Sequence, residues 1–442
     1  MLALLIAGLG ATLAYASLRQ GAVWPQDSNI CLLAVGLLSL IYWLSSRRRN
    51  LAPPLHPLTR FLLIALLALA VLQVLPLPLA LLKLLSPARA ELLNAGATLL
   101  GRPRFATLSI VPAATLEMVL LLSGYVLVLL LVRELAYRTA RRPFATVWPF
   151  LLIAALQSAL GMLQYYGPGS AELARGTYVN RNHYAGFLEM SLPFPIMYAL
   201  FTLRRGQKRF ESPARPALLA CLLLVLAALI LLAITHSLSR GGFLATLASL
   251  FVMALLAIAP GWPAWKRWLP IAATALLAIL AFLYLPTDQF IARFADIAAT
   301  EDISSNTRAQ IWRDTSLLVA AFPLFGCGLG GYESGFLRYK TVAPMNTVDY
   351  AHNDYLQILA EMGLLGFAVL VVLAFRLFTA AVSAASEPYL GLACCAAFTA
   401  ILLHSLVDFN LYIPANAMLL SWIGGIAASL APPGSAPSAA SA

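Results

Sequence analysis

Five short polar segments interrupt the long apolar runs of this sequence. Four of its five histidines lie in them, together with arginines and carboxylates. Histidine exchanges a proton near neutral pH, and the forked guanidinium of arginine binds phosphate groups. These residue types indicate acid–base chemistry on an anionic substrate. The segments are Asn180–His183, Thr235–Gly242, Ser304–Trp312, His352–Gln357 and His404–Asn410.

Two arginines are placed to hold an anion. Arg240 lies in a predicted tight turn close to the hydrocarbon layer, where an unpaired charge is costly. The two glycines after it would permit close approach of a substrate, although snorkelling of the arginine to lipid headgroups is the alternative. Arg308 and Trp312 lie one turn apart on a predicted helix, which is either part of a site or an ordinary surface helix.

His352 is the leading candidate for proton transfer. It opens a predicted span together with Asn353 and Asp354. The partial positive charge of a helix N-terminus favours a bound anion, and it also favours the neutral imidazole that can accept a proton. Asp408 could orient a histidine, pair with an arginine or cap the last helix. Any one of the histidines, taken alone, could instead be an interfacial anchor.

Long apolar helices must position these residues. The chain is 61% hydrophobic and 11% charged, with a mean hydropathy of +0.84. Apolar runs of about 18 to 25 residues recur along it, long enough to cross about 30 Å of hydrocarbon as helices. The short alternating segments of a transmembrane barrel are missing from the sequence. We therefore predict an all-α, polytopic membrane protein with about twelve transmembrane helices in a single domain over residues 1–430, followed by a disordered tail at 431–442.

The basic residues punctuate the apolar runs, so the net charge of +11 does not indicate nucleic-acid binding. Lys and Arg concentrate in the connections that follow every second span, which predicts that this side and both termini are cytoplasmic. The large connection at about 287–352 and all five polar segments then face the periplasm. The predicted spans are 1–18, 29–46, 58–78, 115–137, 146–166, 184–203, 216–236, 242–260, 268–286, 353–376, 388–407 and 411–430.

In combination, the polar segments resemble those of the bacterial O-antigen ligase and polymerase superfamily of inner-membrane glycosyltransferases. The resemblance implies a GT-C-like fold and a glycan donor carried on undecaprenyl diphosphate. It also implies inverting, metal-independent transfer to an acceptor hydroxyl at the periplasmic face, without a cofactor. The matching segments are Asn180–Gly186, His236–Gly242, Asn306–Trp312, Gly326–Gly331, His352–Gly366 and His404–Asn410.

The same resemblance implies roles for individual residues. His352 resembles the general base, and Arg240 and Arg308 resemble the pair that binds the donor diphosphate, with Arg181 as a further contact. Fixed positive charge suits a diphosphate leaving group. No metal site is expected, although Asp296, Glu301 and Asp302 are close enough in sequence to keep Mg²⁺ open. The expected supporting residues are Asn180, His183, His236, Asn353, Asp354 and Asp408.

Several functions remain open within and beyond this superfamily. We favour a ligase that uses a lipid A–core acceptor, because the chain ends soon after the last span without a further domain. A polymerase of repeat units and a protein O-oligosaccharyltransferase are the alternatives. A transporter of the same lipid-linked glycan is the alternative from another class, but no internal repeat is visible and the polar residues gather at one face. The expected partners are membrane lipids, the donor and the glycan acceptor.

Overall fold

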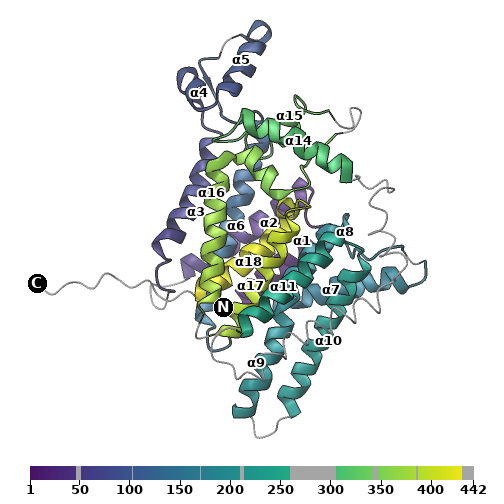
Figure 1. Cartoon of the computed structure of the whole chain (residues 1–442). Coiled ribbons are helices and arrows are strands. Elements are labelled where there is room, and N and C mark those ends of the chain that lie inside the picture. Colours follow the sequence, from purple (N-terminus) through teal and green to yellow (C-terminus); the bar gives the residue numbers. More distant parts are fainter. Residues whose placement is uncertain are drawn as a thin grey trace, which may run out of the picture.

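The chain is a polytopic, helical membrane protein (Figure 1). In the computed structural model, long helices pack side by side and shorter helices cover one end of the bundle. The structure describes residues 1–45, 51–101, 103–169, 171–209, 214–258, 305–341, 347–384 and 387–430.

Seven helical stretches in this part of the chain are long and apolar enough to cross a membrane, and four shorter apolar helices accompany them. They coincide with eleven of the predicted spans, and the remaining one, 268–286, lies outside the described residues. The long stretches are α2 (Pro25–Ser45), α6 (Pro112–Arg138), α7 (Trp148–Tyr166), α8 (Arg181–Ser191) continued by α9 (Pro193–Arg209), α10 (Ala214–His236), α11 (Arg240–Ile258) and α16 (Asp354–Val382). The shorter ones are α1 (Leu2–Leu18), α3 (Pro57–Leu72), α17 (Pro388–His404) and α18 (Pro414–Leu430).

The segment after α3 differs from the prediction. The span expected at 58–78 ends as a helix at Leu72, and Leu77–Pro78 (β1) pairs antiparallel with Phe105–Ala106 (β2). Pro76 and Pro78 lack the backbone N–H that a continued helix needs, which explains the early end. Two short helices, α4 (Leu79–Leu85) and α5 (Pro87–Leu100), lie between the two strands.

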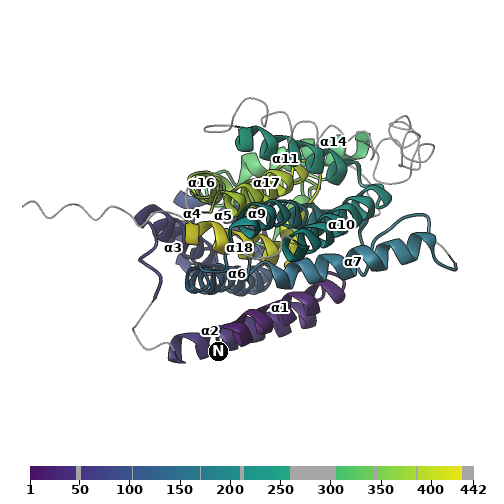
Figure 2. The same cartoon turned by 90° about the horizontal axis from the view of Figure 1, so that it is seen from below.

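Four helices that are not among these spans cover one end of the bundle. Figure 1 shows α4, α5, α14 (Ser305–Ala321) and α15 (Tyr332–Phe336) at this end, whereas the last turns of α9 and the first turns of α10 lie at the other. In Figure 2, α1 and α2 form an outer layer beside α6 and α7, and α11 lies on the far side of the bundle. The helices α17 and α18 lie between, in contact with α11 and α6 respectively.

Close packing of α6 and α18 forms the centre of the bundle. A Cβ added at Gly425 would lie 2.5 Å from the carbonyl oxygen of Leu129, so the backbones of α18 and α6 approach closely there. Small residues allow this kind of helix contact in membrane proteins. The buried Trp422 ring donates from Nε1 to the carbonyl of Thr146 at 3.0 Å. This centre carries the turn that joins α17 to α18 and contains Asp408.

Backbone packing at a break in α16 holds the first two turns of this helix in place. Gly363 has a φ of 65°, and a Cβ there would lie 2.3 Å from the carbonyl carbon of Leu324. The glycine-rich segment Gly326–Gly331 packs against the same place, where Cys327 N donates to Ala360 O at 2.8 Å. The glycines thus allow backbone to pack on backbone. This packing holds the N-terminus of α16, which follows His352, against the turn before α18.

Candidate functional site

The start of α16 is clamped to the turn between α17 and α18. Asn353 is its N-cap, accepting from Leu356 N at 3.1 Å, and its Nδ2 donates to Leu406 O at 2.9 Å. The backbone N–H of Asp354 is shared by the carbonyls of Ser405 and Asp408, at 2.9 and 3.1 Å. The carboxylate of Asp354 also accepts from Ser405 Oγ at 2.7 Å. The two elements therefore form one unit.

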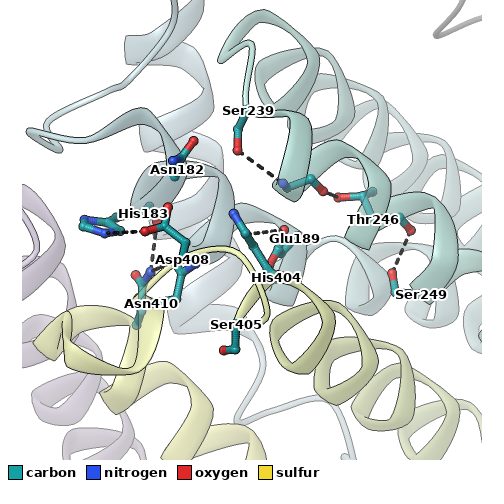
Figure 3. A network of polar contacts seen from close by, with 12 residues as sticks. Asn182, His183, Glu189, Ser239, Thr246, Ser249, His404, Ser405, Asp408 and Asn410 are labelled. Carbon is teal, nitrogen blue, oxygen red and sulfur yellow. Dashed lines mark hydrogen bonds and ion pairs between the residues drawn. The ribbon is translucent and has the colours of Figure 1, made fainter. Parts of the chain in front are cut away.

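Two histidines converge on Asp408 within this unit. His183 Nε2 and His352 Nδ1 lie 3.7 and 3.8 Å from the same oxygen, Asp408 Oδ1 (Figure 3 shows the His183 side). The carboxylate is almost completely buried, whereas the His352 side chain is 17% exposed. Burial raises the pKa of Asp408, but the imidazoles of His183 and His352 outweigh that effect and hold the pKa well below its ordinary value. Asp408 is thus an anion that faces two imidazoles.

Aromatic packing fixes the orientation of both imidazoles. The rings of His183 and His352 meet the ring of Phe409 edge-on, with centroids 4.6 and 5.0 Å away. Tyr350 stacks on Phe409 at 4.1 Å. His352 also has a φ of 49°, in the left-handed region that non-glycine residues rarely adopt and that is found often at active sites. These contacts hold both rings in place, and the His352 side chain remains 17% exposed.

The two arginines of the predicted diphosphate site border the same turn. Arg308, on α14, donates from Nη1 to the carbonyl of Val407 at 3.3 Å. Arg240 is the first residue of α11, and a Cβ added at the adjacent Gly241 would lie 2.8 Å from Cγ2 of Val407. The structure therefore brings the helix starts that carry Arg240 and Arg308 to one residue, next to Asp408. Arg308 belongs to a helix packed onto the bundle, because Trp312, one turn later, donates to Ala351 O at 2.9 Å.

The start of α8 joins this group from the opposite side. Asn180 is its N-cap and accepts from Asn182 N at 2.8 Å, which places Arg181 in the first turn, ahead of His183. The carbonyl of His183 accepts from Asn416 Nδ2 at 2.9 Å, so α8 is tied to α18. Arg181 thus lies at the start of the helix that supplies one of the imidazoles around Asp408.

His236 has a separate set of contacts. Its Nδ1 lies 2.9 Å from Leu232 O, and its Nε2 lies 2.8 Å from the hydroxyl of Tyr166. A carbonyl only accepts, so Nδ1 carries the proton and Nε2 accepts from Tyr166. Tyr165 meets the same ring edge-on at 4.5 Å. The structure therefore places His236 in an aromatic group with α7, at the end of α10.

The sequence reasoning missed one buried pair next to the site. Glu189, on α8, faces Nδ1 of His404, on α17, with its oxygens 3.0 and 3.1 Å away, and both side chains are buried. Figure 3 shows this pair beside Asp408. A single carboxylate within the apolar run around Leu188 and Met190 was the signal, because an ionisable residue inside a span is costly and usually paired.

Unpartnered buried polar atoms gather around Asp408. Buried polar groups nearly always have a hydrogen-bond partner, and exceptions mark strained or functional places. In the described part of the chain, about half of the buried side-chain N and O atoms without such a partner belong to this site. They are His183 Nε2, His352 Nδ1, Asp354 Oδ1, Asp408 Oδ2, Asn410 Nδ2 and Arg308 Nε. The carboxylates that kept a Mg²⁺ site open, Asp296, Glu301 and Asp302, lie outside the described residues.

Comparison with known proteins adds one finding to this geometry. No curated protein matches the chain. Residues 222–371 match the protein family described as O-antigen ligase, and this range includes Arg240, Arg308 and His352. The family indicates membrane glycosyl transfer of the O-antigen ligase or polymerase type. The match confirms the resemblance predicted from the motifs: residues 222–371 carry an O-antigen ligase family domain.

Proposed function

We propose that this protein is an O-antigen ligase-type glycosyltransferase that moves a glycan from undecaprenyl diphosphate to a lipid A–core acceptor at the periplasmic face of the inner membrane. One observation carries the proposal above all others. The buried Asp408 faces Nδ1 of His352, while two arginine-bearing helix starts border the adjacent Val407. A candidate base and a candidate anion-binding pair that meet around one turn suit transfer from a diphosphate donor.

The proposed reaction begins with proton removal. Asp408 accepts a hydrogen bond from Nδ1–H of His352. The other ring nitrogen, Nε2, then carries the lone pair that takes the proton of the acceptor hydroxyl. Their distance of 3.8 Å exceeds a hydrogen bond, but catalytic hydrogen bonds are often long before substrate binds and then shorten. The acceptor oxygen then forms a bond to the anomeric carbon of the donor glycan.

The second half of the reaction is departure of the diphosphate. The bond between the anomeric carbon and the diphosphate oxygen breaks on the face opposite the attack, so the configuration inverts. Undecaprenyl diphosphate leaves with the bonding electron pair, and Arg240 and Arg308 stabilise its growing charge. Preorganised cations are effective here because they need no rearrangement as charge develops.

Transfer by the purified protein in liposomes tests the proposal. A defined undecaprenyl-diphosphate-linked glycan is supplied with lipid A–core, with a peptide acceptor or with no acceptor, each with and without a chelator. We expect transfer to lipid A–core in the presence of chelator. Donor elongation without an added acceptor would show a polymerase, and transfer to the peptide would show a protein oligosaccharyltransferase. Movement of the donor across the bilayer without any new glycosidic bond would contradict the proposal and support a transporter.

A further inference from the structure

The buried pair Glu189–His404 joins three helices next to the site. Glu189 is on α8 and His404 is the last residue of α17. The carboxylate of Glu189 pairs with Nδ1 of the imidazole, so the opposite edge of the ring is directed away from this carboxylate. No role in the reaction described above uses either side chain. A buried charged group is costly unless it is paired, so the pair needs an explanation.

The free edge of the His404 ring supports the first turn of α11. A Cβ added at Gly241 would lie 2.9 Å from Cδ2 and 3.1 Å from Nε2 of this ring, and one at Gly242 would lie 3.3 Å from Cε1. Only glycine allows the backbone after Arg240 to lie this close to the imidazole. On its other side Gly242 faces Ala185 of α8, because a Cβ there would lie 2.7 Å from that of Ala185.

We propose that the Glu189–His404 pair is a positioning device for Arg240: it sets where α11 begins, and thereby places this arginine for a lipid-linked diphosphate. Glu189 fixes the orientation of the imidazole, and the imidazole supports the glycines that follow Arg240. Neither side chain touches the substrate. The inference rests on the proposed donor site and adds two residues to it, both of which lie outside the matched family region.

The pair should therefore act on donor binding through Arg240 alone. His404→Asn keeps a side-chain N–H near the position of Nδ1 for Glu189 but removes the ring edge below Gly241. We expect it to weaken binding of undecaprenyl diphosphate to the purified protein in detergent micelles by about tenfold. In an Arg240→Ala background the same substitution should cause no further loss, because residues that act through one another are not additive. In an Arg308→Ala background its tenfold effect should persist.

Additional outcomes make the experiment decisive. Gly241→Ala, which inserts a methyl group against both the His404 ring and the side chain of Val407, should reproduce the loss and serves if His404→Asn unfolds. Glu189→Gln keeps an acceptor for Nδ1–H and should retain most of the affinity, whereas Glu189→Ala should not. An equal loss in the Arg240→Ala and Arg308→Ala backgrounds would overturn the inference, because the pair would then act generally on the fold. If the wild-type protein fails to bind undecaprenyl diphosphate, the donor assignment itself is wrong and the inference falls with it.

Discussion

Asp408 is the carboxylate on which imidazoles from two distant parts of the chain converge. Its two neighbours differ in access, because the His183 side chain is 8% exposed and that of His352 is 17% exposed. The more accessible imidazole is the better candidate for touching an acceptor, and the less accessible one for holding the carboxylate. Capping of the last helix, the alternative for Asp408, does not apply, since α18 begins at Pro414 and Asp408 Oδ1 accepts from Phe409 N at 2.9 Å.

Removal of the proposed base should abolish transfer without unfolding the protein. A well-placed general base contributes about a hundred- to ten-thousandfold to the rate, so His352→Ala and His352→Gln should both lose transfer by that order. Glutamine keeps a hydrogen bond but cannot take a proton. Initial rates of the purified variants check this, with donor binding measured in parallel. The matched control is His56→Gln, at the N-cap of α3, which should keep the wild-type rate. Undiminished turnover by His352→Gln would leave Asp354 or Asp408 as the base.

The pH dependence separates Asp408 from the histidines. A carboxyl whose pKa is lowered by folding stabilises the protein above its unfolded pKa of about 3.9, and this contribution disappears only as pH falls through the lower folded pKa. Asp408 is therefore ionised throughout about pH 5 to 8, where imidazoles titrate. A fall in rate towards acidic pH in that range therefore does not come from protonation of Asp408.

Asp408→Asn then gives a specific expectation. Loss of the anion makes the neighbouring imidazole harder to protonate, so the acidic limb of the rate profile should move to lower pH. The maximum rate should fall by about tenfold or more, because an orienting partner of a functional histidine is lost. Initial transfer rates measured across about pH 5 to 8 check both effects. An unchanged acidic limb would mean that Asp408 does not face the titrating group.

The shape of arginine matters at the predicted diphosphate site. Arg308→Lys keeps the positive charge but replaces a planar fork by a single ammonium group, which should lower the transfer rate by on the order of a hundredfold. Arg240→Lys should behave similarly. Arg313→Lys, on the same helix as Arg308, is the matched control for a change of this kind on α14. Wild-type rates in both Arg240→Lys and Arg308→Lys would show that these arginines are interfacial anchors.

At the scale of elements, hydropathy predicted the helices well and their interruptions poorly. The ranges of α10 and α11 were nearly as expected, since each is an uninterrupted apolar run bounded by polar residues. The break in α16 was missed because Gly363 lies inside an apolar run and its partner, Leu324, is remote in sequence. Close packing of two backbones leaves no hydrophobic signal. A glycine alone does not reveal whether the chain bends there.

The break at Gly363 should be sensitive to a single methyl group. A side chain at a φ of 65°, with backbone atoms only 2.3 Å from the added Cβ, strains the native state. We expect Gly363→Ala to destabilise the protein by about 1–3 kcal/mol or more and to lower its thermal unfolding temperature in detergent. Gly36→Ala is the control, because nothing lies within 4 Å of a Cβ at that position of α2. Equal melting temperatures for the two variants would contradict the role assigned to the break.

At the scale of the molecule, the site is built from one turn and several helix starts that are far apart in the sequence. His183 begins the set and Asp408 ends it, with Arg240, Arg308 and His352 between. Flanking charge could predict that these residues share one face, because each lies at the same kind of helix end. It could not predict that two imidazoles meet one carboxylate. Such a contact depends on how α8, α16 and α18 pack, and no local pattern encodes that packing.

The two ends of the bundle give the last prediction. Ile110 N donates to Cys327 O at 2.9 Å, so α6 begins at the end that carries α15. With 27 residues α6 rises about 40 Å, and the turn after it therefore lies at the opposite end. Flanking charge predicts that this opposite end is cytoplasmic.

Single cysteines at the exposed positions Ala140 and Ser334 test this orientation. They are introduced in a Cys221→Ala background, because Cys221 is the exposed native cysteine of the described chain. An impermeant thiol reagent applied to intact spheroplasts should label Ser334→Cys and spare Ala140→Cys until the membrane is opened. The reverse pattern would put His352 and Asp408 on the cytoplasmic side, where a glycan donor facing the periplasm could not reach them.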